Sequence, residues 1–540
     1  MDASPCACAT ATAPPLPKDL LHIDPYPFLA HLSRWAAELR ELPTAYDCAI
    51  TPGEVIDFAR EVHGDLAMVP GLRPSQRKAI ATCRRRLALI WGPPGTGKTF
   101  TLGGVIAAHL AANRRVLALS TTNVAVDLIT LAADDAWRAL SHPPRAGEIL
   151  RAGRPQHPAL LEGDDRRHLL RWTEALDAIN HELADYHRER ETLARALQDE
   201  GLTAARRAKL AGREAEVAEA IRELELRRST TLGRLASKAR CVATTFTSYL
   251  ANTHLQNQDF AVTVVDETSM VPAAAVCRLM ADRRESWVFA GDFQQLPPVC
   301  QAARCSAAAA ANWMGKSFFD HLLLGAPSHR NHLRRADVLA VLTEQSRMVI
   351  PLCEVVSNTF YDSLLTTVNP PPLAGFDRTW SSAAIIIVDP THAPTNDGHA
   401  TAPRPQRAGT GAIWDRSAQL IRALVQRLLD APSPPSTIAA ITPYRSQAQL
   451  LDALVTPLDA DRIRAGTIHR MQGSEADVVF LDPVRPADWF PGRSPDAARL
   501  INVAVRRARR QLILVGSPDE LARNPHLAPF VAAADLWQPE

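Results

Sequence analysis

The sequence has no stretch of 18 apolar residues that could span a bilayer, and its N-terminus lacks the basic start and apolar core of a secretory signal. Its nine cysteines are scattered, and only Cys6 and Cys8 lie close together. This spacing argues against a disulfide scaffold and against a paired-cysteine metal or redox motif. We therefore expect a soluble, cytoplasmic protein with reduced thiols and no membrane partner.

The chain also has little net charge. It carries 60 basic and 58 acidic residues, a balance of +2, so nucleic acid would have to be bound by local patches rather than by the field of the whole molecule. With 540 residues it exceeds one ordinary hydrophobic core, and its 46% of apolar residues suffice for the interiors of two or more domains.

Apolar strands alternate with amphipathic helices in two series, which is typical of parallel sheets with helical crossovers. The first series is "LALIWG" from 87, "RVLALST" from 115, "VTVVDE" from 262 and "WVFAGD" from 287. The second is "AAIIIVD" from 383, "TIAAIT" from 437, "DVVFLD" from 477 and "QLILVG" from 511. We predict an α/β protein with an N-terminal tail and helical segment over 1–66 and two tandem domains over 67–330 and 331–540. A helical pattern at Phe28 to Leu42 falls in the first segment, and a surface loop at Pro390 to Gly411 interrupts the last.

The alternation stops between about 165 and 240. Apolar residues recur there at helical spacing on both sides of a break at Gly201, and they are Trp172, Leu176, Ile179, Leu183, Tyr186, Leu193 and Leu197, then Leu210, Val217, Ile221 and Leu224. The pattern predicts a coiled-coil-like helical hairpin inserted into the first domain. It is either a solvated stalk whose apolar stripe joins the two helices or an arm that guides a nucleic-acid strand.

A phosphate-binding loop follows the first apolar strand and opens a helix. Its residues are Gly92, Pro93, Pro94, Gly95, Thr96, Gly97, Lys98 and Thr99. The glycines allow backbone N–H groups to surround the β and γ phosphates, Lys98 adds a positive charge, and Thr99 offers a hydroxyl to Mg²⁺. ATP and Mg²⁺ are therefore the expected cofactors.

Two later strands end in residues that suit hydrolysis. Asp266 ends the strand "VTVVDE" and is placed to coordinate Mg²⁺, and Glu267 beside it can take a proton from an attacking water. Gln295, after the next strand, can orient water or the γ phosphate. An acidic pair at a strand end can also be a simple helix cap, but its place after a phosphate loop favours the hydrolytic role.

Arginines in the second half supply the other part of the predicted site. Arg347 lies in "LTEQSRM", and Arg507 lies in "NVAVRRARRQ". A nucleotide between two domains can be contacted from both, and an arginine that reaches the γ phosphate stabilises the charge of the transition state. We expect Arg347 and Arg507 to be such residues.

In this order of motifs the chain resembles a superfamily 1 helicase, in the branch that includes the nonsense-mediated decay helicase and the replication nuclease-helicases. The motifs are "LRPSQRKAI", the phosphate loop, "LSTTNVAVD", "VATTFTS", "VVDETS", "GDFQQLPPV", "LTEQSRM", "ITPYRSQ", "TIHRMQGSEADVV" and "NVAVRRARRQLILVG". The resemblance covers about residues 70 to 520, and the ordered set is far more specific than any single motif. It implies two RecA-like domains.

The resemblance also implies roles for particular residues. Gln76 would contact adenine, Glu475 would hold the sugar side of the nucleotide, and Arg347 and Arg507 would contact the γ phosphate. The other three arginines of the last motif, Arg506, Arg509 and Arg510, would face solvent or nucleic acid. The implied nucleic-acid contacts are Thr121, Asn123, Thr244, Thr245, Pro443, Tyr444 and Thr467, although each could equally be a helix cap or a core residue.

The resemblance further implies an ATP hydrolase that moves along single-stranded DNA or RNA, 5′ to 3′, as a monomeric motor recruited by separate protein partners. Two alternatives stay open: an ATP-gated clamp that does not separate strands and, less favoured, a small-molecule phosphotransferase. The chain departs from the family at Ser346, where tyrosine is usual, at Arg506, where threonine or serine is usual, and at His469 in the fifth motif. It has no recognisable β-barrel insertion, zinc-binding domain or nuclease motif.

Overall fold

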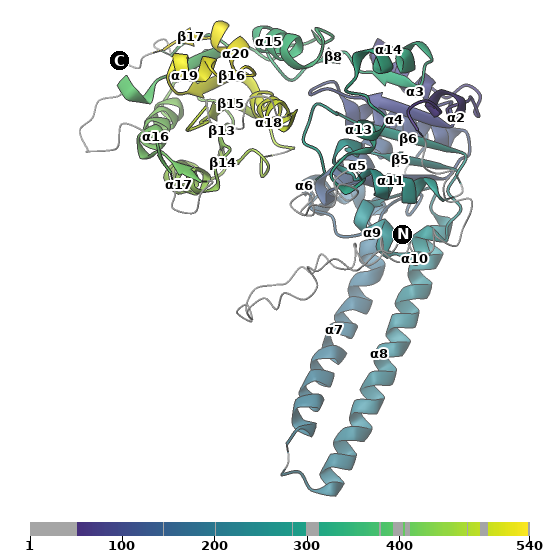
Figure 1. The fold of residues 1–540 in the computed structure, drawn as a ribbon. Coiled ribbons are helices and arrows are strands. Elements are labelled where there is room, and N and C mark those ends of the chain that lie inside the picture. The colour runs from purple at the N-terminus through teal and green to yellow at the C-terminus, as the bar shows by residue number, and fades with distance from the viewer. Residues whose placement is uncertain are drawn as a thin grey trace, which may run out of the picture.

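The computed structural model describes residues 51–143, 145–199, 201–282, 284–298, 313–376, 380–392, 403–405, 411–471, 473–486 and 495–537. The helical pattern predicted at Phe28 to Leu42 and most of the loop predicted at Pro390 to Gly411 lie outside these residues. Within them the chain forms two α/β units and a long helical arm (Figure 1).

The first unit is built on a seven-stranded parallel sheet in the order β3-β4-β2-β5-β6-β1-β7. Its strands are β1 (Leu87–Trp91), β2 (Val116–Ser120), β3 (Ile149–Arg151), β4 (Cys241–Thr245), β5 (Val262–Val265), β6 (Ser286–Gly291) and β7 (Leu339–Val341). Its helices include α2 (Val55–Phe58), α3 (Pro74–Thr82), α4 (Lys98–Ala111), α5 (Asn123–Ala139), α6 (Pro158–Leu161), α9 (Phe246–Ala251), α10 (Thr253–Gln256), α11 (Ala273–Met280), α13 (Phe318–His321) and α14 (Pro327–Arg335). The four strands predicted for this half are confirmed, and β7 extends the sheet past the boundary placed at 330/331.

Both faces of this sheet are buried, as a parallel sheet requires. Successive residues of β1 enter two different hydrophobic clusters: Leu89 packs in one, and Ala88 and Ile90 pack in the other with residues of α3, α4 and α5. Because side chains alternate along a strand, this division places helices on both faces.

The second unit has a six-stranded parallel sheet in the order β14-β13-β15-β16-β10-β17. Its strands are β10 (Ile385–Val388), β13 (Ile438–Thr442), β14 (Ile463–Thr467), β15 (Ala476–Leu481), β16 (Ala508–Val515) and β17 (Asp535–Leu536). Its helices include α15 (Ile350–Phe360), α16 (Asp415–Leu429), α17 (Arg445–Val455), α18 (Pro495–Val505), α19 (Pro518–Ala522) and α20 (Ala528–Ala532). Two short pairs, β8 (Glu344–Gln345) with β9 (Thr366–Thr367) and β11 (Arg404–Pro405) with β12 (Ala412–Ile413), lie outside the sheets. The predicted tandem pair of parallel α/β domains is confirmed.

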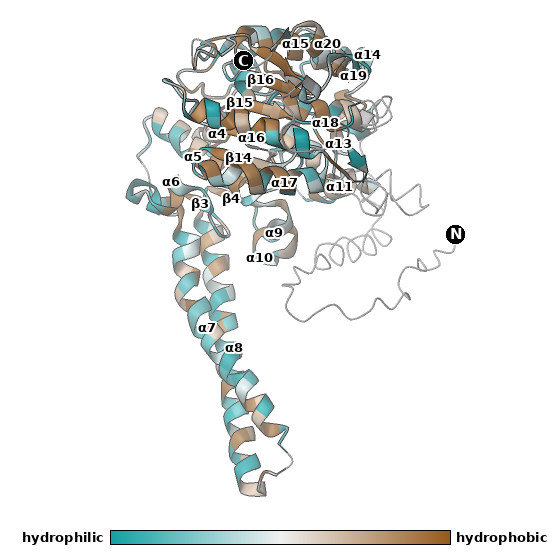
Figure 2. Ribbon diagram, turned by 90° about the vertical axis from the view of Figure 1, so that its left-hand side faces the viewer, coloured by the Kyte–Doolittle hydropathy of each residue, from teal (hydrophilic) through white to brown (hydrophobic). Residues whose placement is uncertain are grey.

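The predicted hairpin is also confirmed, as α7 (Arg171–Leu197) and α8 (Ala204–Lys238). Ile179, Leu183, Val217, Ile221 and Leu224 form its own apolar cluster along the line where the two helices meet. The arm projects from the first unit away from both sheets (Figure 1), and its outer faces are mostly hydrophilic (Figure 2).

The two units share a core. One continuous hydrophobic cluster includes Trp91 and Phe289 of the first sheet and Leu352, Leu500 and Leu514 of the second unit. The units therefore pack directly on each other, and buried groups of one can contact those of the other. No helix among the described residues is long and apolar enough to cross a membrane.

Candidate nucleotide site and nucleic-acid face

The phosphate loop connects β1 to α4 and depends on glycine at two positions. Gly95 and Gly97 have φ of +73° and +75°, in the left-handed region that favours glycine. A Cβ on Gly97 would lie 2.6 Å from Nε2 of Gln76, and a Cβ on Gly95 would lie 2.5 Å from Cβ of Arg347. The glycines therefore allow the Gln motif and the fourth motif to press against the loop.

Lys98 links the loop to the acidic pair that follows β5. Its Nζ lies 2.7 Å from Oε1 of Glu267 and 3.2 Å from Oδ1 of Asp266. Burial alone would raise the pKa of Glu267, but Lys98, with Arg506 and Arg507, outweighs burial and lowers that pKa. Glu267 is therefore a carboxylate at neutral pH, and its Oε2 is buried with no hydrogen-bond partner among the described residues.

Thr99 and Asp266 are suited to hold Mg²⁺. Thr99 lies in the first turn of α4, and Asp266 is 2% exposed. Burial raises the pKa of Asp266, and a metal ion beside it would reverse that effect. The described residues contain no group of three or more metal-ligating side chains. In nucleotide sites Mg²⁺ is usually held by one or two protein oxygens together with phosphate and water, and Thr99 and Asp266 would supply the protein oxygens.

Two arginines of the second half lie against this site. Ser346 donates its backbone N–H to O of Gly95 at 3.1 Å, which holds the fourth motif on the phosphate loop. The neighbouring Arg347 places Nε 2.5 Å from Oε2 of Glu475. Of the three residues predicted to contact the nucleotide from the second half, Arg347 and Glu475 are thus paired with each other in this structure.

Arg507 is 3% exposed and lies at the start of β16. Its Nη1 donates to O of Ser474 at 2.9 Å, while Nε and Nη2 have no hydrogen-bond partner among the described residues. Burial, Arg506 and Arg347 lower the pKa of Arg507 well below its ordinary value, against the opposing effect of Glu267 and Glu475. A buried guanidinium with unpaired donors is costly, and an anion such as a phosphate would relieve that cost.

The prediction that Arg506 faces solvent or nucleic acid is wrong. Arg506 is 3% exposed, and its Nη1 lies 3.9 Å from Oδ2 of Asp292, at the end of β6. Arg510 stays at the surface, but its side chain donates to O of Pro372 and O of Leu373. The cause is tertiary: the charge of Arg506 is balanced by a carboxylate from the other domain, which local sequence does not reveal.

Asp292 is the centre of a buried polar cluster between the domains. Gln295 donates to its Oδ2 at 2.9 Å, and the hydroxyl of Tyr361 donates to the same oxygen at 2.7 Å. Asn502 of α18 donates from Nδ2 to O of Gln294 and to the hydroxyl of Tyr361, both at 2.8 Å. The predicted phosphate sensor Gln295 is thus tied to the second domain.

The sequence motifs gave no role to Asp292, Tyr361 and Asn502. Asp292 could have been noticed because it ends a strand next to the Asp266 strand. Tyr361 belongs to none of the motifs, and Asn502 opens the last motif, but nothing in that motif indicates a contact with Asp292, which lies 210 residues earlier in the chain.

Comparison with known proteins now assigns the family. An AAA domain family matches residues 71–303, and a second AAA domain family matches residues 315–519. The DNA polymerase alpha-associated DNA helicase A of Saccharomyces cerevisiae is 26% identical over 487 residues, which cover 84% of this chain and 66% of that protein. The chain therefore carries two matched AAA domains and is distantly related to superfamily 1 helicases.

Other relatives of this chain come from distant organisms. An uncharacterized ATP-dependent helicase of Methanocaldococcus jannaschii is 25% identical over 84% of this chain and 69% of its own length. The regulator of nonsense transcripts 1 of Caenorhabditis elegans is 27% identical over 87% of this chain but only 39% of its own length. Among solved structures, the arterivirus nonstructural protein 10 helicase aligns over 85% of this chain and 65% of its own with a TM-score of 0.35 and 14% identity.

The predicted nucleic-acid residues of the first domain lie on one half of the sheet. Thr121 follows β2, Asn123 begins α5, and Thr244 and Thr245 end β4. Strands β4 and β2 are neighbours, whereas the phosphate loop follows β1, three places further along. Thr244 is 1% exposed, and Thr245 caps α9 by accepting the N–H of Ser248, so these two side chains have structural roles in this structure.

Asn123 is held by a buried ion pair. Arg151 is fully buried, with Nε 2.6 Å from Oδ1 of Asp127 and Nη2 donating to Oδ1 of Asn123 at 3.0 Å. Because the guanidinium uses the amide oxygen of Asn123, the amide nitrogen is the group left to donate elsewhere. This orientation suits a phosphate acceptor.

The predicted residues of the second domain gather at the carboxyl ends of two adjacent strands. Pro443 and Tyr444 follow β13, and Thr467 ends β14, where it is the register partner of Thr442. Tyr444 is partly buried and packs on a small apolar cluster that includes Trp414. In contrast, Arg507 precedes β16, so it lies at the amino ends of the parallel strands, opposite their carboxyl ends.

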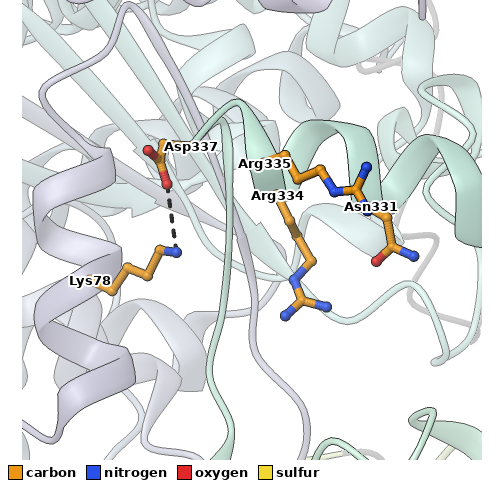
Figure 3. Close-up of a pocket in the computed structure, with 5 residues that line it drawn as sticks. All are labelled: Lys78, Asn331, Arg334, Arg335 and Asp337. Carbon is orange, nitrogen blue, oxygen red and sulfur yellow. Dashed lines mark ion pairs between the residues drawn. The ribbon is translucent and has the colours of Figure 1, made fainter.

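A surface pocket of about 480 Å³ lies apart from these groups. Lys78 of α3 and Asn331, Arg334 and Arg335 of α14 line it, with Asp337 3.5 Å from Lys78 (Figure 3). Its paired charges are exposed, and of its residues Lys78 alone belongs to a motif quoted above, "LRPSQRKAI". We therefore do not include it in the site.

Proposed function

We propose that this helicase chain hydrolyses ATP between its two domains and uses the cycle to move along single-stranded nucleic acid, 5′ to 3′. One observation carries the proposal. Arg507, from the second domain, keeps two buried guanidinium nitrogens unpaired among the described residues, and the field of Glu267 acts on it. Groups from both domains thus act on one region, where the phosphates of a triphosphate would accept hydrogen bonds from the unpaired nitrogens of Arg507.

In the proposed mechanism the residues exchange partners when ATP binds. Lys98 leaves Asp266 and Glu267 for the phosphates, which frees Asp266 to hold Mg²⁺ with Thr99. That ion would neutralise phosphate charge. Glu267, already ionised, accepts a proton from the attacking water. Arg347 and Arg507 stabilise the charge that develops on the γ phosphate.

The cluster around Asp292 would transmit the cycle to the second domain. Gln295, Tyr361 and Arg506 all contact this carboxylate, and they come from both sides of the interface. A change at the γ phosphate that moves Gln295 would alter these contacts and shift the balance between closed and open domains. Alternating grip by the two domains on one strand would then move the helicase.

Two measurements test the proposal. Single-stranded DNA or RNA should stimulate ATP turnover, and a labelled strand should be displaced from a duplex with a 5′ tail but not from one with a 3′ tail. Stimulated turnover without displacement from either duplex would favour the ATP-gated clamp. ATP turnover that responds to neither DNA nor RNA would overturn both. The names of the relatives refer to both DNA and nonsense transcripts, so the assay should include both DNA and RNA.

We expect a monomeric motor that depends on separate protein chains for recruitment. Sedimentation of the purified chain, with and without a single-stranded oligonucleotide, tests the first part.

A further inference from the structure

The side chain expected to recognise adenine is not accessible. Gln76 is 3% exposed. Its Oε1 accepts the N–H of Arg73 at 2.9 Å, and its Nε2 donates to O of Thr96 in the phosphate loop at 3.0 Å. The amide of Gln76 therefore supports the phosphate loop, and both of its polar atoms are hydrogen-bonded within the protein.

The neighbouring polar groups are occupied as well. Arg73 donates from Nη1 to O of Glu344 at 2.8 Å and from Nη2 to the hydroxyl of Ser346 at 3.0 Å. Ser75 donates its hydroxyl to the carboxylate of Glu344. The Gln motif and the fourth motif thus bond to each other. Ser346 also brings no ring, although it stands where the family usually has tyrosine.

One side chain beside Gln76 is exposed and aromatic. Phe100 lies in the first turn of α4 and is 40% exposed, which is unusual for a phenylalanine. Its Cβ lies 4.0 Å from the Cβ position of Gly97, the same position that Nε2 of Gln76 approaches. Phe100 and Gln76 therefore flank the same point of the phosphate loop, and only Phe100 presents a surface to solvent.

We propose that the nucleotide site holds the base by stacking on Phe100 and does not read the base edge, so that it accepts nucleoside triphosphates with all four bases. An aromatic ring stacks on any base, because every base has a π face. Discrimination would instead need polar groups left unpaired by the wrong base, and here those groups are paired internally. The proposal rests on the proposed nucleotide site and adds its substrate range.

Equilibrium binding of ADP, GDP, CDP and UDP tests the proposal without requiring hydrolysis. We expect their dissociation constants to agree within about threefold. Phe100→Ala should weaken all four by about tenfold, the effect of losing one stacked base, and Phe100→Trp should restore them. Inorganic tripolyphosphate, which has no base, should bind wild type and Phe100→Ala equally. Leu226→Ala, at an exposed apolar residue of α8, is the matched control and should change nothing.

Gln76→Ala separates the two roles of the amide. As a support for the phosphate loop, Gln76 should affect all four diphosphates and tripolyphosphate by the same factor. A loss confined to ADP, a preference of wild type for ADP above tenfold, or an unchanged affinity in Phe100→Ala would each overturn the inference. Diphosphates that bind as expected to a chain that hydrolyses no triphosphate would instead overturn the proposed function and leave this inference standing.

Discussion

Removing Lys98 should damage the protein before any nucleotide is added. Its side chain is 11% exposed and lies between the carboxylates of Asp266 and Glu267, which are 3% and 26% exposed. In Lys98→Ala two neighbouring carboxylates lose their shared cation. Loss of one partner from a buried ion pair costs roughly 3–5 kcal/mol, and we expect the free energy of unfolding to fall by about 3 kcal/mol. Lys98→Ala is therefore a poor test of nucleotide binding alone.

Glu267→Gln should behave differently. Lys98 keeps Asp266 at 3.2 Å, and one buried charge disappears, so the stability should stay within about 1 kcal/mol of wild type. ATP should still bind, but turnover stimulated by single-stranded nucleic acid should fall by about 10² to 10⁴, the usual contribution of a general base. The double variant Lys98→Ala with Glu267→Gln should recover part of the stability lost in Lys98→Ala, because only one carboxylate then lacks a cation.

Denaturant unfolding at pH 7.5 without nucleotide and a steady-state ATPase assay measure both effects. If Lys98→Ala unfolds at the same denaturant concentration as wild type, the bridging position of Lys98 in the nucleotide-free protein is wrong. If Glu267→Gln turns over ATP at the wild-type rate, the proton acceptor is another group.

Three further predictions follow from buried or oriented groups. Arg507→Ala should lower nucleic-acid-stimulated ATP turnover by at least about 10³. It should also raise the stability of the nucleotide-free protein, because it removes unpaired buried donors. Turnover assays and thermal melting measure these effects, and a variant as stable as wild type would argue against unpaired nitrogens on Arg507. Asn123→Asp should weaken binding of a single-stranded oligonucleotide about tenfold, because it removes the oriented donor and adds negative charge. The ATPase rate without nucleic acid should stay unchanged. An unaltered affinity for the oligonucleotide would show that Asn123 is not part of the interface. Burial raises the pKa of Asp482 to about 6, so between pH 4 and 6 the folded protein keeps a proton that the unfolded chain releases. The free energy of unfolding should therefore fall as the pH rises through this range, by up to about 3 kcal/mol for a shift of about two pKa units. The same dependence on pH in Asp482→Asn would refute the assignment to Asp482.

Local patterns in the sequence were enough to predict the two parallel sheets and the phosphate loop. A buried parallel strand is a short apolar run, and the eight predicted runs are strands of the two sheets. The helical hairpin could also be predicted, because apolar residues recur at helical spacing through both α7 and α8. The other strands of the two sheets, β3, β4, β7, β14 and β17, were not predicted. Three of them, β3, β7 and β17, have only two or three residues and therefore no periodicity of their own.

The sequence by itself also determined which residue types could contact a triphosphate, because Lys98, Glu267 and the arginines follow recognisable motifs. Only the tertiary structure decided which of them are buried, what they pair with and which way they face. Arg506 was expected at the surface and lies buried near Asp292. Gln76 was expected to contact adenine, but it is buried and donates to O of Thr96 in the phosphate loop. The reason is physical: pairing of buried charges depends on distances between segments far apart in the chain, and local spacing carries no information about those distances.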